Sequence, residues 1–187
     1  MTFKDATFSS TDGSFSNSTI IVQGNAVFGG AGAGQQNLSG GTLSVFKNFT
    51  QLTGTVSGNT GLTFNTSSDH VTAFAGNTSQ AVSFADPTTS KFSIVRITNG
   101  VAPVVFNSNV QFVNGTTQPR LEVQAGGLTI PAVLNLGGGT WKLFNGTTTT
   151  VTGSMVSAGA CQGRAAGATL AGTGLINDVA VASFSCP

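Results

Sequence analysis

The stretch GTLSVFKNFTQLTGTVSGNTGLTF, from Gly41 to Phe64, carries one charged residue in 24 and repeatedly alternates a bulky apolar residue with a small hydroxyl residue. Alternation with a period of two is typical of a short β-strand that buries one face and exposes the other. Apolar residues spaced three or four positions apart, which an amphipathic helix needs, are missing from it. The stretch therefore predicts short strands separated by turns.

The same pattern continues along most of the chain as triplets in which a polar residue lies between two apolar ones. Between the triplets lie residue types that favour turns, in pairs such as Asp86-Pro87 and Asn99-Gly100. A helical period over ten or more residues is absent, so we predict an all-β chain. The triplets are Leu43–Val45, Leu62–Phe64, Val82–Phe84, Phe92–Ile94, Val95–Ile97, Val110–Phe112, Leu121–Val123, Leu128–Ile130, Leu134–Leu136 and Trp141–Leu143.

The composition excludes several classes of protein. Charged residues make up only 7% of the 187 residues, against about 25% in an average soluble protein. The seven basic residues are scattered among six acidic ones, so no basic stripe is predicted to bind nucleic acid. Apolar runs stay shorter than the ~18 residues of a membrane span. The N-terminus is unlike a signal peptide, so an exported protein would be present as a mature form or an excised piece.

The spacing of the triplets favours a right-handed parallel β-solenoid over the alternative, a β-sandwich or jelly roll. The triplets at Leu43, Leu62 and Val82 begin 19 and 20 residues apart, and a solenoid has turns of ~20–25 residues. Equivalent residues of successive turns stack ~4.8 Å apart, so like charges would repel, whereas asparagine amides can form hydrogen-bonded ladders. This explains the low charge. A sandwich usually carries more charge on its outer faces.

The two cysteines, Cys161 and Cys186, both lie near the C-terminus. We predict that they form a disulfide, which indicates an oxidising compartment. The domain is divided into a solenoid body over residues 1–152 and a Gly/Ala-rich, disulfide-linked segment over residues 153–187 that packs on the same domain. Within this segment, Leu175-Ile176 and Val179–Phe184 are expected to add one or two last strands.

Three stretches carry a resemblance to a known group of proteins. They are LSGGTLSVFKNFTQ (38–51), QAVSFADPTTSKFSIVRITNG (80–100) and LNLGGGTWKLFNGTTTTVTGSM (134–155). They resemble modules of repetitive secreted bacterial β-solenoid proteins of the filamentous-haemagglutinin and autotransporter-passenger kind. The resemblance implies an extracellular or cell-surface location and a structural or adhesive role. It implies no catalytic motif.

Candidate chemistry in the sequence is sparse. The one histidine, His70, follows two serines and Asp69, and we expect a solvated turn residue there rather than part of a catalytic triad. The acidic residues occur singly, so we predict no catalytic residue, cofactor or metal site. The threonine run at residues 147–152 suits an ice-binding face only if neighbouring strands repeat it. We expect Trp141, in a triplet, to be buried.

Self-association is predicted from the ends of the coil. A solenoid of about seven to nine turns leaves unpaired backbone groups on its first and last turns, as any sheet edge does. Few charges protect these edges, so we expect end-to-end stacking or strand exchange into a head-to-tail polymer. The residues expected to pair are Thr7, Phe8, Ile20, Ile21, Val22 and Phe184.

The sequence thus predicts a non-catalytic structural or adhesive module of an extracellular bacterial surface assembly. The expected partners are further copies of the chain or similar solenoid modules, with surface polysaccharide as a further candidate, and neither nucleic acid nor a membrane span is expected. Two alternatives stay open: a carbohydrate- or ice-binding solenoid module, and an enzyme similar to polysaccharide lyases.

Overall fold

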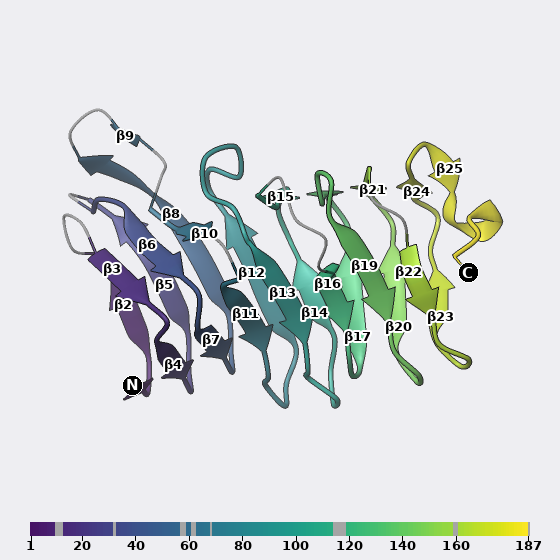
Figure 1. Cartoon of the computed structure of the whole chain (residues 1–187), viewed down its shortest axis with the longest axis horizontal. Coiled ribbons are helices and arrows are strands. Elements are labelled where there is room, and N and C mark those ends of the chain that lie inside the picture. The colour runs from purple at the N-terminus through teal and green to yellow at the C-terminus, as the bar shows by residue number, and fades with distance from the viewer. Residues whose placement is uncertain are drawn as a thin grey trace.

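The computed structural model describes residues 1–9, 13–31, 33–56, 59–60, 63–67, 69–113, 119–158 and 161–186. They form a parallel β-solenoid of about seven turns. The turns, called rungs below, follow one another from the N-terminal to the C-terminal end of the molecule (Figure 1). The structure confirms the predicted parallel solenoid and excludes the β-sandwich, because sheet neighbours come from successive rungs and run parallel.

Two long sheets run the length of the coil, and each takes one strand from each rung. Sheet 1 contains β1 (Thr2–Phe3), β4 (Thr19–Val22), β7 (Thr42–Val45), β11 (Val71–Phe74), β13 (Ile94–Ile97), β16 (Pro119–Val123), β19 (Thr140–Leu143) and β22 (Cys161–Arg164). Sheet 2 contains β2 (Ala6–Phe8), β5 (Ala26–Gly30), β8 (Phe49–Val56), β12 (Gln80–Phe84), β14 (Val104–Phe106), β17 (Gly127–Ile130), β20 (Thr148–Val151) and β23 (Thr169–Ala171), with β9 (Asn59–Thr60) paired antiparallel to β8.

The third side of the coil consists of two shorter sheets. The N-terminal one contains β3 (Gly13–Ser16), β6 (Gln36–Ser39) and β10 (Asn65–Ser67). The C-terminal one contains β15 (Val110–Gln111), β18 (Val133–Asn135), β21 (Ser154–Val156), β24 (Leu175–Ile176) and β25 (Val179–Ala180), and the short 3₁₀ helix η1 (Val181–Ser183) follows. Lys91 and Phe92 make isolated bridges to the two sheets and so join them.

The rungs differ in length. Thr2 pairs with Ile21, a step of 19 residues, whereas Thr42 pairs with Val71, a step of 29 residues. The longest rung contains the β8–β9 hairpin, which projects from the coil at the upper left of Figure 1. Residues 41–64 therefore supply most of one rung, as predicted, but the number of residues per rung is not constant.

The core is a stack of apolar side chains between the three sides. Phenylalanine rings from successive rungs pack on one another through its N-terminal half, with Phe49 in contact with five other rings. Trp141 is 1% exposed, so the prediction that it is buried is confirmed. Most triplets form strands as predicted. The middle residues Thr63 and Ser93 of two triplets are instead buried outside the strands, and Leu62, the first residue of one of these triplets, lies outside the described residues.

The solenoid strands continue past residue 152, where the sequence analysis placed the end of the solenoid body. The strand β21 pairs in register with β18, and β22 and β23 extend sheets 1 and 2. The solenoid therefore continues through β24, because the Gly/Ala-rich residues stack on the rung before them and need no core of their own. The expected strand at Leu175-Ile176 is present as β24. Of the stretch Val179–Phe184, Val179–Ala180 forms the strand β25, and the rest continues as η1 (Val181–Ser183) and a residue outside the strands.

Candidate functional site

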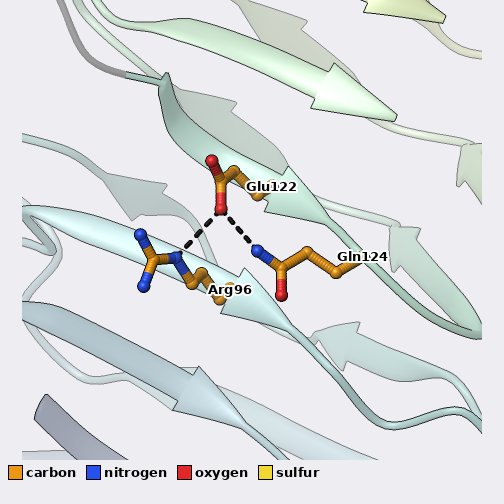
Figure 2. Close-up of polar contacts among 3 residues, drawn as sticks. All are labelled: Arg96, Glu122 and Gln124. Carbon is orange, nitrogen blue, oxygen red and sulfur yellow. Dashed lines mark hydrogen bonds and ion pairs between the residues drawn. The ribbon is translucent and has the colours of Figure 1, made fainter. Parts of the chain in front are cut away.

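Three charged side chains of alternating sign occupy paired positions on the outer face of sheet 1: Arg96, Glu122 and Lys142. Arg96 Nε donates to Glu122 Oε2 at 2.9 Å. The same oxygen accepts from Gln124 Nε2 at 2.6 Å, so the carboxylate lies between two donors (Figure 2). Like charges at the ~4.8 Å strand spacing would repel. The alternating signs avoid this repulsion, as the low charge of the chain led us to expect.

Asparagine ladders link successive rungs. At the corner between sheets 1 and 2, the Asn25 N–H donates to Asp5 Oδ1 at 2.7 Å, and the Asn48 N–H donates to Asn25 Oδ1 at 3.2 Å. On the third side, Asn65 Nδ2 donates to Asn37 Oδ1 at 2.8 Å. The second ladder is the amide-to-amide kind that the sequence predicts. The first ladder instead holds the backbone of each corner to the rung before it.

The first rung ends the coil with open strand edges. In the described residues, β1, β2 and β3 each form one end of their sheet, with no strand paired to their outer side. Three phenylalanines of this rung pack together: the Phe3 and Phe8 centroids are 6.3 Å apart, and those of Phe8 and Phe15 are 5.8 Å apart. Phe3 is 37% exposed. The N-terminal end therefore combines unpaired backbone with an aromatic surface.

The last rung is covered by the end of the chain. The strand β25 folds back on β24, and η1 then places Val181 in the core. Phe184 follows, with its ring centroid 5.9 Å from that of Trp141. The predicted disulfide between Cys161 and Cys186 is present, with Cα atoms 5.5 Å apart, and it fixes this tail to β22. Figure 1 shows the tail beyond the last rung at the right.

The residues predicted to form pairing edges are only partly at an edge. Thr7 and Phe8 lie in β2, at the open end. The prediction for Ile20–Val22 is wrong, because these residues lie in β4, between β1 and β7. The first residues of the chain form a further strand, in which Thr2 pairs with Ile21. This strand, β1, pairs with the edge of β4 that the sequence analysis expected to be open.

The prediction for Phe184 is also wrong. It lies in no strand and packs, partly buried, against Trp141. Conversely, Phe3 and Phe15 at the open end were missed. The feature of the sequence that could have indicated them is the concentration of phenylalanine at residues 3, 8 and 15, before the first triplet of the chain.

His70 is buried rather than solvated, which corrects the sequence-based expectation. It is 1% exposed at the corner that leads into sheet 1. Its Nδ1 lies 2.7 Å from the Gly40 carbonyl oxygen and therefore carries the proton. Its Nε2 is buried without a hydrogen-bond partner among the described residues. Burial lowers the pKa of His70 below its ordinary value of 6.5, although the bond to Gly40 acts in the opposite direction.

Arg120 lies near the start of β16, at the register shift between Pro119 and Leu121, and is also buried. Its Nη1 donates to the Ser93 carbonyl oxygen at 3.0 Å and to the Ser93 hydroxyl at 2.9 Å. Burial lowers the pKa of Arg120, and the negative charge of Asp69 opposes that shift. Hydrogen bonds to a charged donor are among the stronger ones in proteins. This arginine therefore links two rungs from the inside of the coil.

The free energy of unfolding is expected to fall as the pH is lowered from 7 to 5. The pKa of His70 is lower in the folded protein than in the unfolded chain, so the unfolded chain binds more protons in this range. The His70 contribution is complete above pH 6.5 and is lost towards the folded-state pKa, by at most about 1.4 kcal/mol per pH unit. Denaturant unfolding at several pH values measures it. The variant His70→Gln should flatten this dependence, and an unchanged slope would contradict the assignment.

The threonine run forms a small patch on sheet 2 rather than an array. Thr149 is buried, whereas Thr148 and Thr150 are at least partly exposed. Thr150 pairs with Thr129 on β17, and Thr148 pairs with Thr169 on β23. The other two paired positions are Gly127 and Ala171, so the regular repeat of an ice-binding face is not formed.

Two pockets open at the two corners that adjoin sheet 1. The one at the corner between sheets 1 and 2 has a volume of about 390 Å³ and is lined by Gln23, Phe46, Lys47, Ala75, Asn77 and Thr78. The one at the corner that leads into sheet 1 has a volume of about 340 Å³ and is lined by Asn17, Ser39, Gly40, Gly41 and Asp69. The first combines apolar surface, including the Phe46 ring, with a lysine, a hydroxyl and two amides, which suits a ligand that has both an apolar face and polar groups.

The described parts of the chain contain no group of three or more His, Cys, Asp or Glu side chains placed to hold a metal ion. Among the same residues, there is no helix with the length and apolar character that crossing a membrane requires. Comparison with known proteins found no matching family model, no matching curated protein and no matching solved structure.

Proposed function

We propose that the chain is a non-catalytic structural and adhesive block of an extracellular or cell-surface assembly, and that two copies join through their first rungs. The observation that carries this proposal is the difference between the two ends of the coil. The last rung is covered by a disulfide-bonded tail, whereas the first rung has open strand edges beside Phe3 and Phe8. The disulfide fits a secreted protein, and the resemblance to bacterial surface solenoids supports the same location.

A second copy of the first rung is the partner that this end fits best. Open strand edges pair with other strands through their backbone groups. A twofold axis makes the contact self-complementary, because the strand edges and Phe3 of one copy face the same groups of the other. The Asp5 carboxylate is directed to the second rung, where its Oδ1 accepts from the Asn25 N–H at 2.7 Å. Burial of the exposed part of Phe3 adds an apolar contribution.

The covered C-terminal end favours a closed pair over the head-to-tail polymer that the sequence predicts. A head-to-tail polymer needs an accessible edge at each end. Among the described residues, β22 and β23 also have no strand paired to their outer side, but the disulfide to Cys161 and the contact of η1 with β23 place the tail over this end (Figure 1). Seven steps at the ~4.8 Å strand spacing give each copy a length of about 34 Å, and two joined copies would form a rod of about 70 Å. The pair thus forms a longer rigid spacer than one copy alone.

Sedimentation velocity over a range of protein concentrations tests this pairing. We expect a monomer–dimer equilibrium that Phe3→Ser weakens by about tenfold or more, because one aromatic side chain leaves the interface. The matched control is Val101→Ser, which replaces an exposed apolar residue at a corner far from the first rung. A monomer at all concentrations, an open series of larger oligomers, or equal effects of the two substitutions would contradict the proposal.

A further inference from the structure

The pocket at the corner between sheets 1 and 2 is formed because the corner loops of neighbouring rungs differ in length. Residues 23–25 and 46–48 make short connections between the sheets, whereas residues 75–79 make a longer one. The longer loop contributes Ala75, Asn77 and Thr78 to the pocket, beside Phe46 of the shorter loop. The pocket therefore lies beside a projecting loop. Corner loops of equal length would stack evenly and would leave no pocket.

Buried amide side chains hold the projecting loop in place. Gln80 is fully buried, and its Nε2 donates to the carbonyl oxygens of Val45 and Lys47 at 2.9 and 2.7 Å. Its Oε1 accepts from the N–H of Gly76 at 3.0 Å. The buried Asn99 in turn donates through Nδ2 to the Thr78 carbonyl oxygen at 2.7 Å. The backbone of residues 45–47 and the loop at residues 75–79 are thus both fixed before any ligand binds.

Gly76 allows the loop at residues 75–79 to lie close to the backbone of Phe46 in the preceding rung. A Cβ atom at this position would clash with the Phe46 carbonyl oxygen and would crowd the Gln80 side chain. The absence of a side chain at this position therefore lets the loop approach the backbone of the preceding rung. A rigid pocket of this kind loses little conformational entropy when it binds a ligand.

The side chains that line the pocket have a consistent chemistry. Phe46 is 37% exposed, so part of its ring is free to contact a ligand. Lys47 is exposed, and no acidic residue lines the pocket to neutralise its charge. Gln23, Asn77 and Thr78 add amide and hydroxyl groups that both donate and accept hydrogen bonds. An aromatic surface, one cation and several neutral polar groups favour a polyhydroxylated ligand that carries one negative charge.

We propose that this pocket binds one uronate unit of an acidic polysaccharide. The apolar face of the sugar ring packs on Phe46, and the carboxylate pairs with Lys47. The sugar hydroxyls exchange hydrogen bonds with Asn77, Thr78 and Gln23. The volume of about 390 Å³ lies within the usual range for small-ligand sites. This binding does not rest on the proposed pairing of first rungs, because the pocket is formed by corner loops of a single copy.

A titration of the isotopically labelled full chain, followed by NMR, tests the site. The probes are an oligomer of galacturonate, the matching neutral oligomer of galactose, and acetate as a charge-only control. We expect the acidic oligomer to shift the amide signals of residues 46–48 and 75–79. Its affinity should exceed that of the neutral oligomer by about tenfold or more, the size expected for one charge-assisted hydrogen bond.

Three variants separate the contributions. The substitution Lys47→Met should abolish the preference for the acidic oligomer, and Phe46→Ala should weaken binding of both oligomers. The control Lys142→Met removes an exposed lysine on sheet 1 and should change neither. The proposal is overturned by the absence of any shift at millimolar oligomer, by equal shifts with acetate, or by an unchanged preference in the Lys47 variant. Sedimentation of the same samples reports the pairing separately, so the two proposals can fail independently.

Discussion

Replacement of both Cys161 and Cys186 by serine is expected to lower the free energy of unfolding by about 3–4 kcal/mol and to expose Trp141. The two cysteines are 25 residues apart, and a cross-link of that length restricts the unfolded chain by about this amount. In the folded protein, the same bond holds the tail that places Phe184 beside Trp141. Without it, the tail is still held by the β24–β25 pairing, by the bond from the Val181 N–H to the Gly174 carbonyl oxygen and by the burial of Val181.

The measurement is direct because the chain has a single tryptophan. Denaturant unfolding gives the loss of stability, and the emission maximum and acrylamide quenching of Trp141 report whether the tail has left the last rung. The control is the unmodified protein with and without a reducing agent, which should reproduce the difference between the parent and the double variant. Unchanged stability together with an equally protected Trp141 would show that the disulfide does not hold the cover of the last rung.

The substitution Phe49→Ala is expected to destabilise the protein by about 3–5 kcal/mol. Phe49 is fully buried, and its ring packs against rings from its own rung and from the rungs on both sides. The centroid distances are 5.5 Å to Phe28, 4.9 Å to Phe64, 6.3 Å to Phe74, 5.4 Å to Phe84 and 5.3 Å to Phe92. The cavity left by the substitution would therefore lie at the centre of the stack, where neighbouring rungs cannot collapse into it.

The matched control is Phe46→Ala, three residues earlier in the same rung. Phe46 is 37% exposed at a corner, so its removal leaves little cavity and is expected to cost less than about 1 kcal/mol. Chemical denaturation of both variants compares the two positions directly. Similar losses at the two positions would contradict the packing described for the core.

Alternation along the chain correctly predicted the strands and the faces they present. Leu121-Glu-Val123 is a clear case, because β16 buries Leu121 and Val123 and turns Glu122 outward between Arg96 and Lys142. The low charge of the chain also predicted the stacking, since only charges of alternating sign tolerate the ~4.8 Å spacing between rungs. These features depend on residues that are neighbours in the chain, or on the composition as a whole.

The corners could not be predicted in the same way. His70 lies at a corner and Arg120 at the register shift in β16, and both are buried. At a corner or a register shift, the alternation of strand faces no longer tells which way a side chain points. The pocket beside Phe46 was missed for a related reason, because it depends on one corner loop being longer than those of the preceding rungs.

The sequence by itself determined the all-β class, the stacking of parallel strands and the pairing of the two cysteines. Only the tertiary structure decided which strands lie at the ends. Ile20–Val22 is inside sheet 1 because Thr2 pairs with Ile21, and Phe184 covers the last rung instead of extending it. The physical reason is that alternation is local, whereas strand pairs between rungs join residues 19 to 33 positions apart, as Thr2 with Ile21 and Phe49 with Val82. The positions of the corners set the number of residues between paired strands. These positions depend on the packing of the whole coil.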